Sequence, residues 1–102
     1  MTAKRVDDNQ REIVNFFRRA GCSVLILSAV GKGCPDAIVG LQLPNGARRN
    51  FLIEIKNGNR PPSGQLLTEM EQHFFDTWKG QVMIINSIEK AQNFMAQLLK
   101  ET

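Results

Sequence analysis

The sequence predicts an α/β fold in which helices flank a four-stranded mixed sheet, in the order helix, three strands, helix, strand, helix. Three observations support this fold class. Apolar residues recur at helical spacing near the start, in the middle and at the end of the chain. Pro44, Asn45 and Gly46 are turn formers between two strand-like segments and indicate a hairpin. The last strand follows a crossover helix, and the right-handed crossover rule makes it parallel to the strand before that helix.

The first two elements are a helix and a strand. We expect the helix over residues 8–20, with Asp7 or Asp8 as its N-terminal cap, a stop at Gly21, and an apolar stripe of Ile13, Val14, Phe16 and Phe17. A strand is expected over residues 22–29. Because residues 24–27 are all apolar, this strand is predicted to be buried on both faces.

The two strands of the hairpin follow. The first is expected over residues 36–43 and the second over residues 51–56. In the second strand, alternate positions separate an apolar face from a face that carries Glu54 and Lys56. Residues 57–64 are polar and rich in glycine and proline, which predicts an irregular loop after Lys56.

The last three elements are a helix, a strand and a helix. Thr68 and Glu71 have the spacing of a capping box, so a helix is expected over residues 68–79, with Gly80 as its stop. Its apolar residues are predicted to form a core stripe, namely Met70, Phe74, Phe75 and Trp78. A strand over residues 81–85 and a helix capped by Ser87 and reaching residue 100 complete the chain, the helix placing inward Ile88, Ala91, Phe94, Met95 and Leu98.

Length and composition limit the class of protein. The 102 residues are predicted to form one domain, and the 42% of hydrophobic residues is ordinary for a globular protein. No apolar run is as long as a membrane span and the first eleven residues are polar, so we expect a cytoplasmic protein with no membrane partner. Neither the two cysteines nor the single histidine has the spacing of a metal site, and no small-molecule cofactor is expected.

Two acids and an amine are predicted to meet on the hairpin. Asp36 stands at the start of the first hairpin strand, and pairing of the two strands can bring it close to Glu54 and Lys56. Neighbouring carboxylates repel each other, and a hard divalent cation such as Mg²⁺ relieves that repulsion. Such a site, with an amine beside the attacking water, favours phosphodiester hydrolysis. On its own, a Glu-x-Lys pattern is more often an exposed strand with a cross-strand ion pair.

Taken together, these residues resemble a known superfamily. Pro35-Asp36 followed by Glu54-Ile55-Lys56, after the glycine-rich entry of residues 31–33, resembles the PD-(D/E)XK nucleases. The closer resemblance is to the small VRR-NUC-type nucleases of phages and bacteria, which are similar in fold to Holliday junction resolvases. The resemblance extends over residues 1–102 as a single VRR-NUC-like nuclease domain. It implies a restriction-endonuclease-like core and a metal-dependent DNA endonuclease, for which selectivity for branched or junction DNA is one option.

The resemblance also implies roles for individual residues. Asp36, Glu54 and the main-chain carbonyl of Ile55 are expected to hold one or two Mg²⁺ ions, for which Mn²⁺ can substitute. Lys56 would serve the attacking water. Glu12, on the first helix, and Glu71, early in the second helix, are expected to take part, although Gln65 and Gln72 are alternatives to Glu71. A homodimer is expected, because junction-resolving relatives act as twofold dimers on symmetric DNA.

The charge distribution points to a polyanionic partner. Residues 1–60 hold ten Lys and Arg against five Asp and Glu, whereas residues 61–102 hold three against five. Lys32 and Arg60 lie in loops next to the motif and are candidate phosphate contacts. Arg48 and Arg49 are adjacent in the hairpin, so only one can face the ligand, and Arg49 is the third candidate.

Three other functions remain open from the sequence. The same fold could bind nucleic acid without cutting it, or it could cut RNA instead of DNA. A protein-interaction domain, in which Glu54 and Lys56 only pair on a strand, belongs to a different class and would bind neither metal nor nucleic acid. Magnesium-dependent cleavage of labelled DNA and RNA distinguishes these alternatives.

Overall fold

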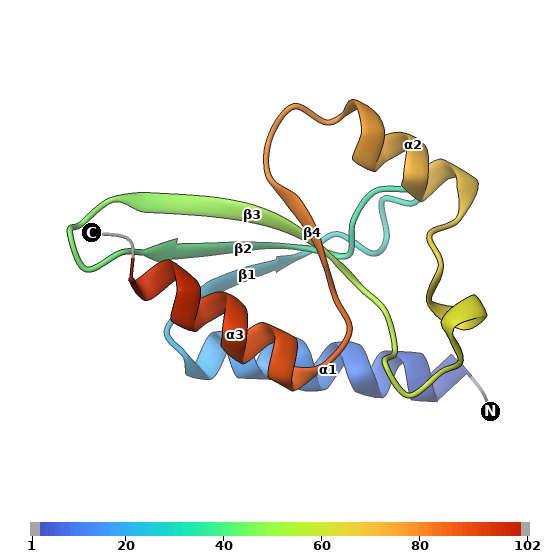
Figure 1. Ribbon diagram of the computed structural model, residues 1–102, viewed down its shortest axis with the longest axis horizontal. Coiled ribbons are helices and arrows are strands. Elements are labelled where there is room, and N and C mark those ends of the chain that lie inside the picture. Colours follow the sequence, from blue (N-terminus) through green and yellow to red (C-terminus); the bar gives the residue numbers. More distant parts are fainter. Residues whose placement is uncertain (1–2, 101–102) are drawn as a thin grey trace.

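The computed structural model describes residues 3–100, with side chains from residue 9 onward, and it confirms the predicted order of elements (Figure 1). The helices and strands are α1 Ala3–Arg19, β1 Ser23–Ile26, β2 Ala37–Gln42, β3 Arg48–Ile55, α2 Glu69–Thr77, β4 Val82–Ile85 and α3 Ile88–Leu99, and a short 3₁₀ helix spans Pro62–Gln65. Across residues 3–100, none of the helices combines the length and the apolar character that crossing a bilayer requires.

The sheet is mixed, as predicted. Its strands lie in the order β1-β2-β3-β4, with β2 antiparallel to both neighbours and β3 parallel to β4. The β2–β3 turn is closed by the Gly46 amide, which donates to the Leu43 carbonyl at 2.8 Å, and Gly46 has a φ of +90°, which suits glycine. Pairing of Gln42 with Arg48 carries β3 down to this turn, so β3 begins three residues before its predicted start.

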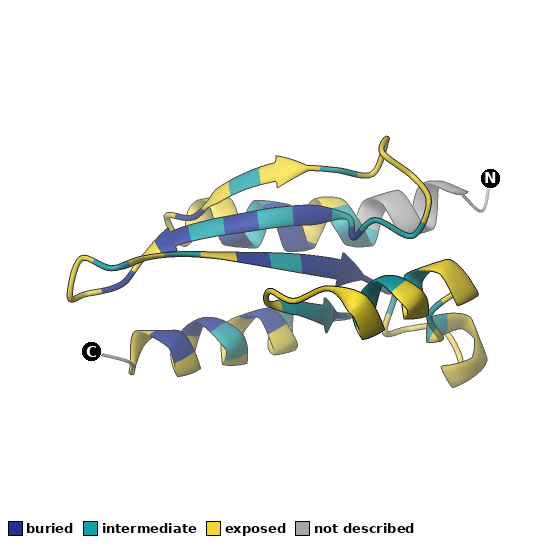
Figure 2. Ribbon diagram, turned by 90° about the horizontal axis from the view of Figure 1, so that it is seen from above, coloured by how far each residue is buried: buried dark blue, intermediate teal, exposed yellow. Residues whose placement is uncertain are grey.

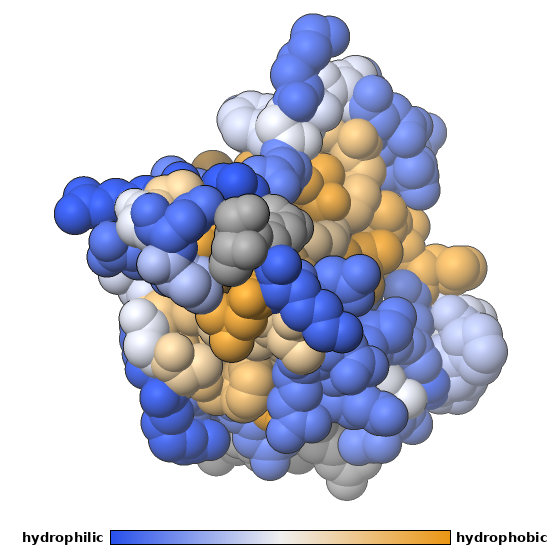
Figure 3. Space-filling model, turned by 60° about the vertical axis from the view of Figure 1, so that its left-hand side comes forward, coloured by the Kyte–Doolittle hydropathy of each residue, from blue (hydrophilic) through white to orange (hydrophobic). Residues whose placement is uncertain are grey.

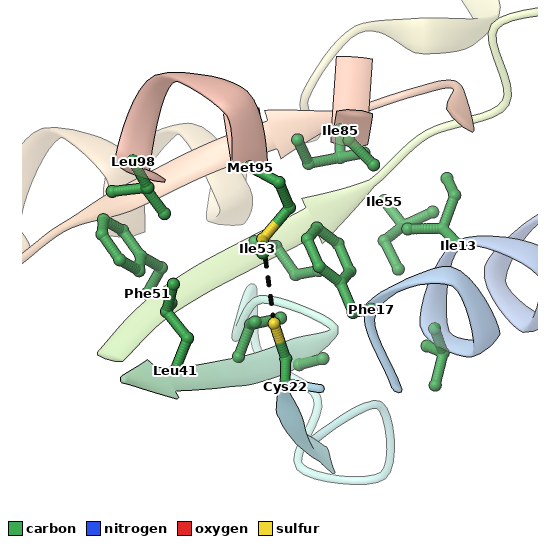
Figure 4. Packing of buried hydrophobic residues seen from close by; sticks show 14 of the residues in the cluster. Ile13, Phe17, Cys22, Leu41, Phe51, Ile53, Ile55, Ile85, Met95 and Leu98 are labelled. Carbon is green, nitrogen blue, oxygen red and sulfur yellow. Dashed lines mark hydrogen bonds between the residues drawn. The ribbon is translucent and has the colours of Figure 1, made fainter. Parts of the chain in front are cut away.

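The hydrophobic core lies between one face of the sheet and the helices α1 and α3 (Figure 1). Alternate residues of β2 and β3 point into it, and Phe94 of α3 makes edge-on ring contacts with Phe17 at 6.1 Å and Phe51 at 4.9 Å. The Cys22 thiol lies 3.8 Å from the Met95 sulfur inside this core (Figure 4). The apolar stripes predicted for the first and last helices are therefore confirmed, with Phe16, Ile88 and Phe94 only partly buried.

Helix α1 is longer than predicted. It begins at Ala3, so the predicted cap at Asp7 or Asp8 is wrong, and the side chains of these two residues lie outside the described part. Its C-terminus ends as expected at Gly21, whose φ is +93°. The Gly21 amide donates to Arg18 and the Cys22 amide to Phe17, which is the hydrogen-bond pattern of a glycine-terminated helix.

Strand β1 contradicts the prediction that it is buried on both faces. It is only four residues long, and Leu25 and Ile26 are 60% and 42% exposed. The reason is its place at the edge of the sheet, where one face and one side have no neighbouring element (Figure 2). A run of apolar residues indicates a strand, but it does not reveal whether a second layer covers that strand.

Helix α2 also departs from the prediction. Its capping box is present, but none of its residues is buried, and Met70 and Trp78 are 54% and 49% exposed. The helix stands apart from α1 and α3, on the opposite face of the sheet (Figures 1 and 2). The rings of Phe74 and Trp78 stack on each other at 5.0 Å. The helix ends at Thr77, and Trp78 is already extended, so Gly80 is not its stop.

A close backbone approach fixes α2 to the loop before β2. A Cβ atom on Gly33 would lie 2.5 Å from the Met70 carbonyl oxygen, and Gly33 has a φ of +80°. We predict that Gly33→Ala lowers the free energy of unfolding by about 2–3 kcal/mol, because it adds a steric clash to the cost of a left-handed backbone. Urea unfolding measures this loss.

Gly31→Ala is the matched control for this prediction. Gly31 has a similar φ of +73°, but nothing lies within 4 Å of its Cβ position. This variant should lose only about 1 kcal/mol, the cost of the backbone conformation alone. Equal losses in the two variants would contradict a close contact between this loop and α2.

Candidate functional site

The register of β2 and β3 places Asp36 beside Glu54. Ala37 pairs with Ile53, and the Asp36 amide donates to the Ile53 carbonyl at 2.9 Å. Because the strands are antiparallel, Asp36, just before Ala37, lies opposite Glu54, just after Ile53. Both side chains point to the face of the sheet away from α1 and α3. This face is called the open face below, and its strand residues are Ser23, Leu25, Ile38, Gly40, Gln42, Arg48, Asn50, Leu52, Glu54, Val82 and Ile84.

The carboxylate of Asp36 is held by the backbone of the neighbouring strand. Its Oδ2 atom accepts a hydrogen bond of 2.7 Å from the Ile55 amide. Burial raises the pKa of Asp36 and the charge of Glu71 adds to this effect, whereas the Ile55 hydrogen bond and the charge of Lys56 oppose it. Asp36 is thus oriented by the residue that lies between Glu54 and Lys56.

Glu54 is a buried acid with a strongly shifted pKa. It is 4% exposed and is the only buried charged residue in the described part of the chain. Burial, followed by the charges of Asp36 and Glu71, raises its pKa from the usual 4.5 to about 8. At neutral pH the Glu54 carboxyl therefore holds a proton when no cation is present.

Lys56 and Glu71 form an ion pair across the site. The Lys56 Nζ atom lies 2.9 Å from Glu71 Oε1 and 3.6 Å from Glu54 Oε2. Burial acts to lower the pKa of Lys56, but the hydrogen bond and charge of Glu71 outweigh it, so this pKa is raised. Burial acts to raise the pKa of Glu71, but hydrogen bonds from Lys56 and the Thr68 amide outweigh it, so that pKa is lowered. Both groups are therefore charged at neutral pH.

These side chains line one pocket of about 410 Å³ on the open face. Arg60 and Gly64 of the loop after β3 also line it, together with Gln10 of α1. The loop is ordered by Gln65, whose amide donates to the Arg60 carbonyl at 2.6 Å and whose carbonyl oxygen accepts from Asn86. Arg60 is thus placed at the pocket, where the sequence predicted a phosphate contact.

The structure decides between the three candidates for the second-helix position. Glu71 lies in the pocket, bonded to Lys56. Gln65 belongs to the loop, and the Gln72 side chain donates to Asp76 along the exposed surface of α2. Glu71 reaches the site because its place in the capping box turns its side chain back towards Thr68 and the start of the helix.

Three predicted site residues lie away from this pocket. Glu12 lines a separate groove with Arg19 and Ile88, since it lies about 160° around α1 from Gln10. Because side chains alternate along a strand, Arg49 lies on the face of Phe51 and Ile53, opposite to the face of Glu54. Lys32 is exposed in the loop before β2 and is absent from the pocket lining, although its φ of +56° is unusual for a residue other than glycine.

Sequence reasoning missed the two α1 residues that do reach the site. The Asn9 side chain donates to the Lys56 carbonyl at 2.7 Å, and Gln10 lines the pocket. Their position follows from the helical phase, because the stripe of Ile13, Val14 and Phe17 faces the core and Asn9 and Gln10 precede it by one turn. An expectation that the site residue on α1 is acidic directed attention to Glu12 instead.

The charges of the site suit a divalent cation. Three carboxyl groups face a single ammonium group, and burial, followed by the charges of Asp36 and Glu71, raises the pKa of Glu54. Among the described residues, no three side chains of His, Cys, Asp or Glu converge on one cation position. Asp36 and Glu54 bring two carboxyl groups into the pocket, and Mg²⁺ takes one or two carboxylates and completes its shell with water, carbonyl or phosphate oxygens.

Comparison of the chain with models of known protein families, with curated proteins and with solved structures returned no match. The functional assignment therefore rests on the chemistry of the site itself.

The shifted pKa of Glu54 predicts how stability depends on pH. Between about pH 5.5 and about pH 7.5 the folded metal-free protein holds a proton that the unfolded chain has released, so stability falls as pH rises. The free energy of unfolding should fall by up to about 1.4 kcal/mol per pH unit. Urea unfolding in the presence of chelator should show this slope in the wild type and not in Glu54→Gln.

Glu69→Gln is the matched control for this pH dependence. Glu69 is an exposed carboxyl group in the first turn of α2, so its loss should leave the slope unchanged. A wild-type stability that stays constant or rises over this range would contradict the burial of a protonated Glu54.

Proposed function

We propose that this protein is a metal-dependent nuclease of the PD-(D/E)XK type that hydrolyses phosphodiester bonds in DNA. The observation that carries the proposal is the convergence of Asp36, at the entry of β2, with Glu54 and Lys56, at the end of β3, in one pocket on the open face. The order of the elements around this pocket is the one that the resemblance to these nucleases implies. A cytoplasmic location belongs to the same proposal.

The acids of the pocket would hold the metal. Asp36 and Glu54 would supply carboxylate oxygens, and the resemblance to these nucleases makes the carbonyl of Ile55 the third candidate ligand. Mg²⁺ held by these residues, or Mn²⁺ in its place, would supply Lewis-acid chemistry for the phosphodiester and the attacking water. Asp36 is already oriented for this role by the Ile55 amide, and Glu54 has to release its proton to bind a cation.

Lys56 and Glu71 would act on the water and the phosphate. Lys56 keeps its positive charge in a half-enclosed position, with its side chain 15% exposed. From there the ammonium group can orient the attacking water or offset the charge that develops on the phosphate oxygens. Glu71 holds Lys56 by a contact of 2.9 Å, and Asn9 holds the backbone of the same residue.

The surroundings of the pocket favour a polymer over a small anion. The pocket lies at one end of β2 and β3, whose open face runs away from it, and Arg60 lines it. Arg60, with Lys32 from the loop before β2, would contact phosphates next to the scissile bond. DNA is proposed over RNA because the resembling nucleases act mainly on DNA.

A homodimer is the second part of the proposal. One pocket spans few phosphates, whereas two copies related by a twofold axis match the symmetry of junction DNA. Apolar side chains that a partner could cover are exposed on and near α2, including Leu66, Met70 and Trp78. On the side seen in Figure 3, apolar surface gathers in patches bordered by hydrophilic groups.

We predict that Asp36→Ala and Lys56→Ala each lower DNA cleavage by at least about a hundredfold, because each removes a group that stabilises the transition state. Gel assays on labelled branched and linear DNA, with Mg²⁺, Mn²⁺ or chelator, measure this loss. Chelator should abolish cleavage by the wild type. Circular dichroism checks that the variants fold.

Glu12→Ala is the matched control for these variants, since Glu12 lies outside the pocket and its loss should leave cleavage unchanged. Full cleavage by either Asp36→Ala or Lys56→Ala would reject the assignment. Binding of DNA with no cleavage under any metal condition would favour an inactive binding module, and cleavage of RNA alone would replace the proposed substrate.

The proposed dimer is tested by light scattering at micromolar concentration. The expected mass is twice that of the 11.5 kDa chain. Met70→Lys, which places a charge on the exposed apolar part of α2, should shift the mass towards that of one chain. A wild-type mass equal to one chain would count against the dimer and leave the assignment of the site untouched.

A further inference from the structure

A second groove is lined by residues of the open face near the β2–β3 turn. This turn lies at the end of the sheet away from α2 (Figure 1). It has a volume of about 360 Å³, and its lining includes Ser23, Gly40, Gln42, Arg48, Arg49 and Asn50. None of the described residues that line it is acidic. The exposed Arg48, with the amide and hydroxyl donors of Ser23, Gln42 and Asn50, suits this groove to an anion that carries oxygen acceptors.

The floor of this groove depends on a glycine in the middle of the sheet. Ser23, Gly40 and Asn50 are direct partners across β1, β2 and β3. A Cβ atom on Gly40 would lie 3.0 Å from the Asn50 Oδ1 atom and 3.9 Å from the Ser23 Cβ atom. The missing side chain leaves a hollow between two polar side chains, with the exposed Arg48 at its edge.

The groove and the proposed active site share one face and one strand. Arg48, Asn50 and Glu54 occupy alternate positions of β3 and point the same way. At about 3.3 Å per residue, Asn50 and Arg48 lie about 13 Å and about 20 Å from Glu54 along the strand. Successive phosphates of a duplex strand rise about 3.4 Å along its axis, so the groove is about four to six nucleotides from the pocket.

The active site has no net positive charge of its own to attract DNA. The carboxyl groups of Asp36, Glu54 and Glu71 share the pocket with the cations Lys56 and Arg60, so a further cation on the open face adds attraction for a phosphate backbone. Among the strand residues of the open face that the structure describes, Arg48 is the single cation. Leu52 and Ile38, which lie between the groove and the pocket, are uncharged and do not oppose a backbone that crosses them.

We propose that this groove binds the phosphate backbone of a duplex DNA arm, about four to six nucleotides from the bond that the Asp36–Glu54 pocket cuts. The distance to the cleaved bond rests on the proposed nuclease function, whereas binding of DNA in the groove requires no metal. The duplex runs along β3, from the pocket to the β2–β3 turn, across a molecule whose longest dimension is 42 Å. Arg48, and not the neighbouring Arg49, is the residue that faces the DNA.

The test is binding of a labelled duplex of about 20 base pairs in chelator and at low salt, followed by fluorescence anisotropy. Arg48→Ala should weaken binding about tenfold and reduce the slope of log affinity against log salt by about one, since one phosphate contact is lost. Arg48→Lys, which keeps the charge, should restore the salt slope. Circular dichroism should show wild-type folding, because Arg48 is exposed.

Arg19→Ala is the matched control. Arg19 is an exposed arginine in the groove beside Ile88, on the helix side of the sheet, and its removal should leave affinity and salt slope unchanged. Wild-type binding by Arg48→Ala, an equal loss in Arg19→Ala, or no binding by the wild type would overturn the inference. Binding that depends on Arg48, without metal-dependent cleavage, would support DNA binding in the groove and reject the nuclease assignment. Metal-dependent cleavage that is unaffected by Arg48→Ala would support the nuclease assignment and reject DNA binding in the groove.

Discussion

The hydrogen bond from the Ile55 amide to the Asp36 carboxylate is the constraint on which the site depends. This bond of 2.7 Å joins the entry of β2 to the end of β3 and turns Asp36 towards Glu54. Two acids are then confined in a place where burial raises the pKa of both. The fold thus concentrates negative charge at one end of the open face, and a proton on Glu54 limits the repulsion when no cation is bound.

The same end of the sheet holds α2 by polar contacts in place of a shared core. The helix has no buried residue, and its links to other described segments include the Lys56–Glu71 ion pair and the close approach of Gly33 to Met70. Glu71 caps its own helix and binds Lys56 with the same oxygen atom. The position of α2 is therefore coupled to the charge state of the site, since Lys56 also faces Glu54.

Much of the fold and the centre of the site could be predicted from the sequence because the signals are local. Alternation along residues 51–56 placed Glu54 and Lys56 on one face, and the turn formers before Gly46 fixed the pairing that brings Asp36 to them. The capping box located the start of α2 and so the position of Glu71. Each of these patterns is complete within a few residues.

The predictions that failed needed information about neighbouring layers. Nothing in residues 24–27 shows that β1 is an edge strand, so a run of apolar side chains was assigned to the interior although Leu25 is exposed. The stripe with Met70 has the spacing of a core stripe, and the sequence does not show that α2 lacks a partner layer. The choice of Glu12 over Gln10 ignored the helical phase set by Ile13 and Phe17.

The central claim is that Asp36 and Glu54 together form a divalent-cation site. Calorimetric titration with Mn²⁺ at about pH 7, in two buffers of different ionisation enthalpy, tests it most directly. The account predicts saturable binding with release of close to one proton per ion, because Glu54 has to lose its proton first, and loss of that binding in Asp36→Asn. No saturable binding by the wild type, or unchanged binding by Asp36→Asn, would contradict it.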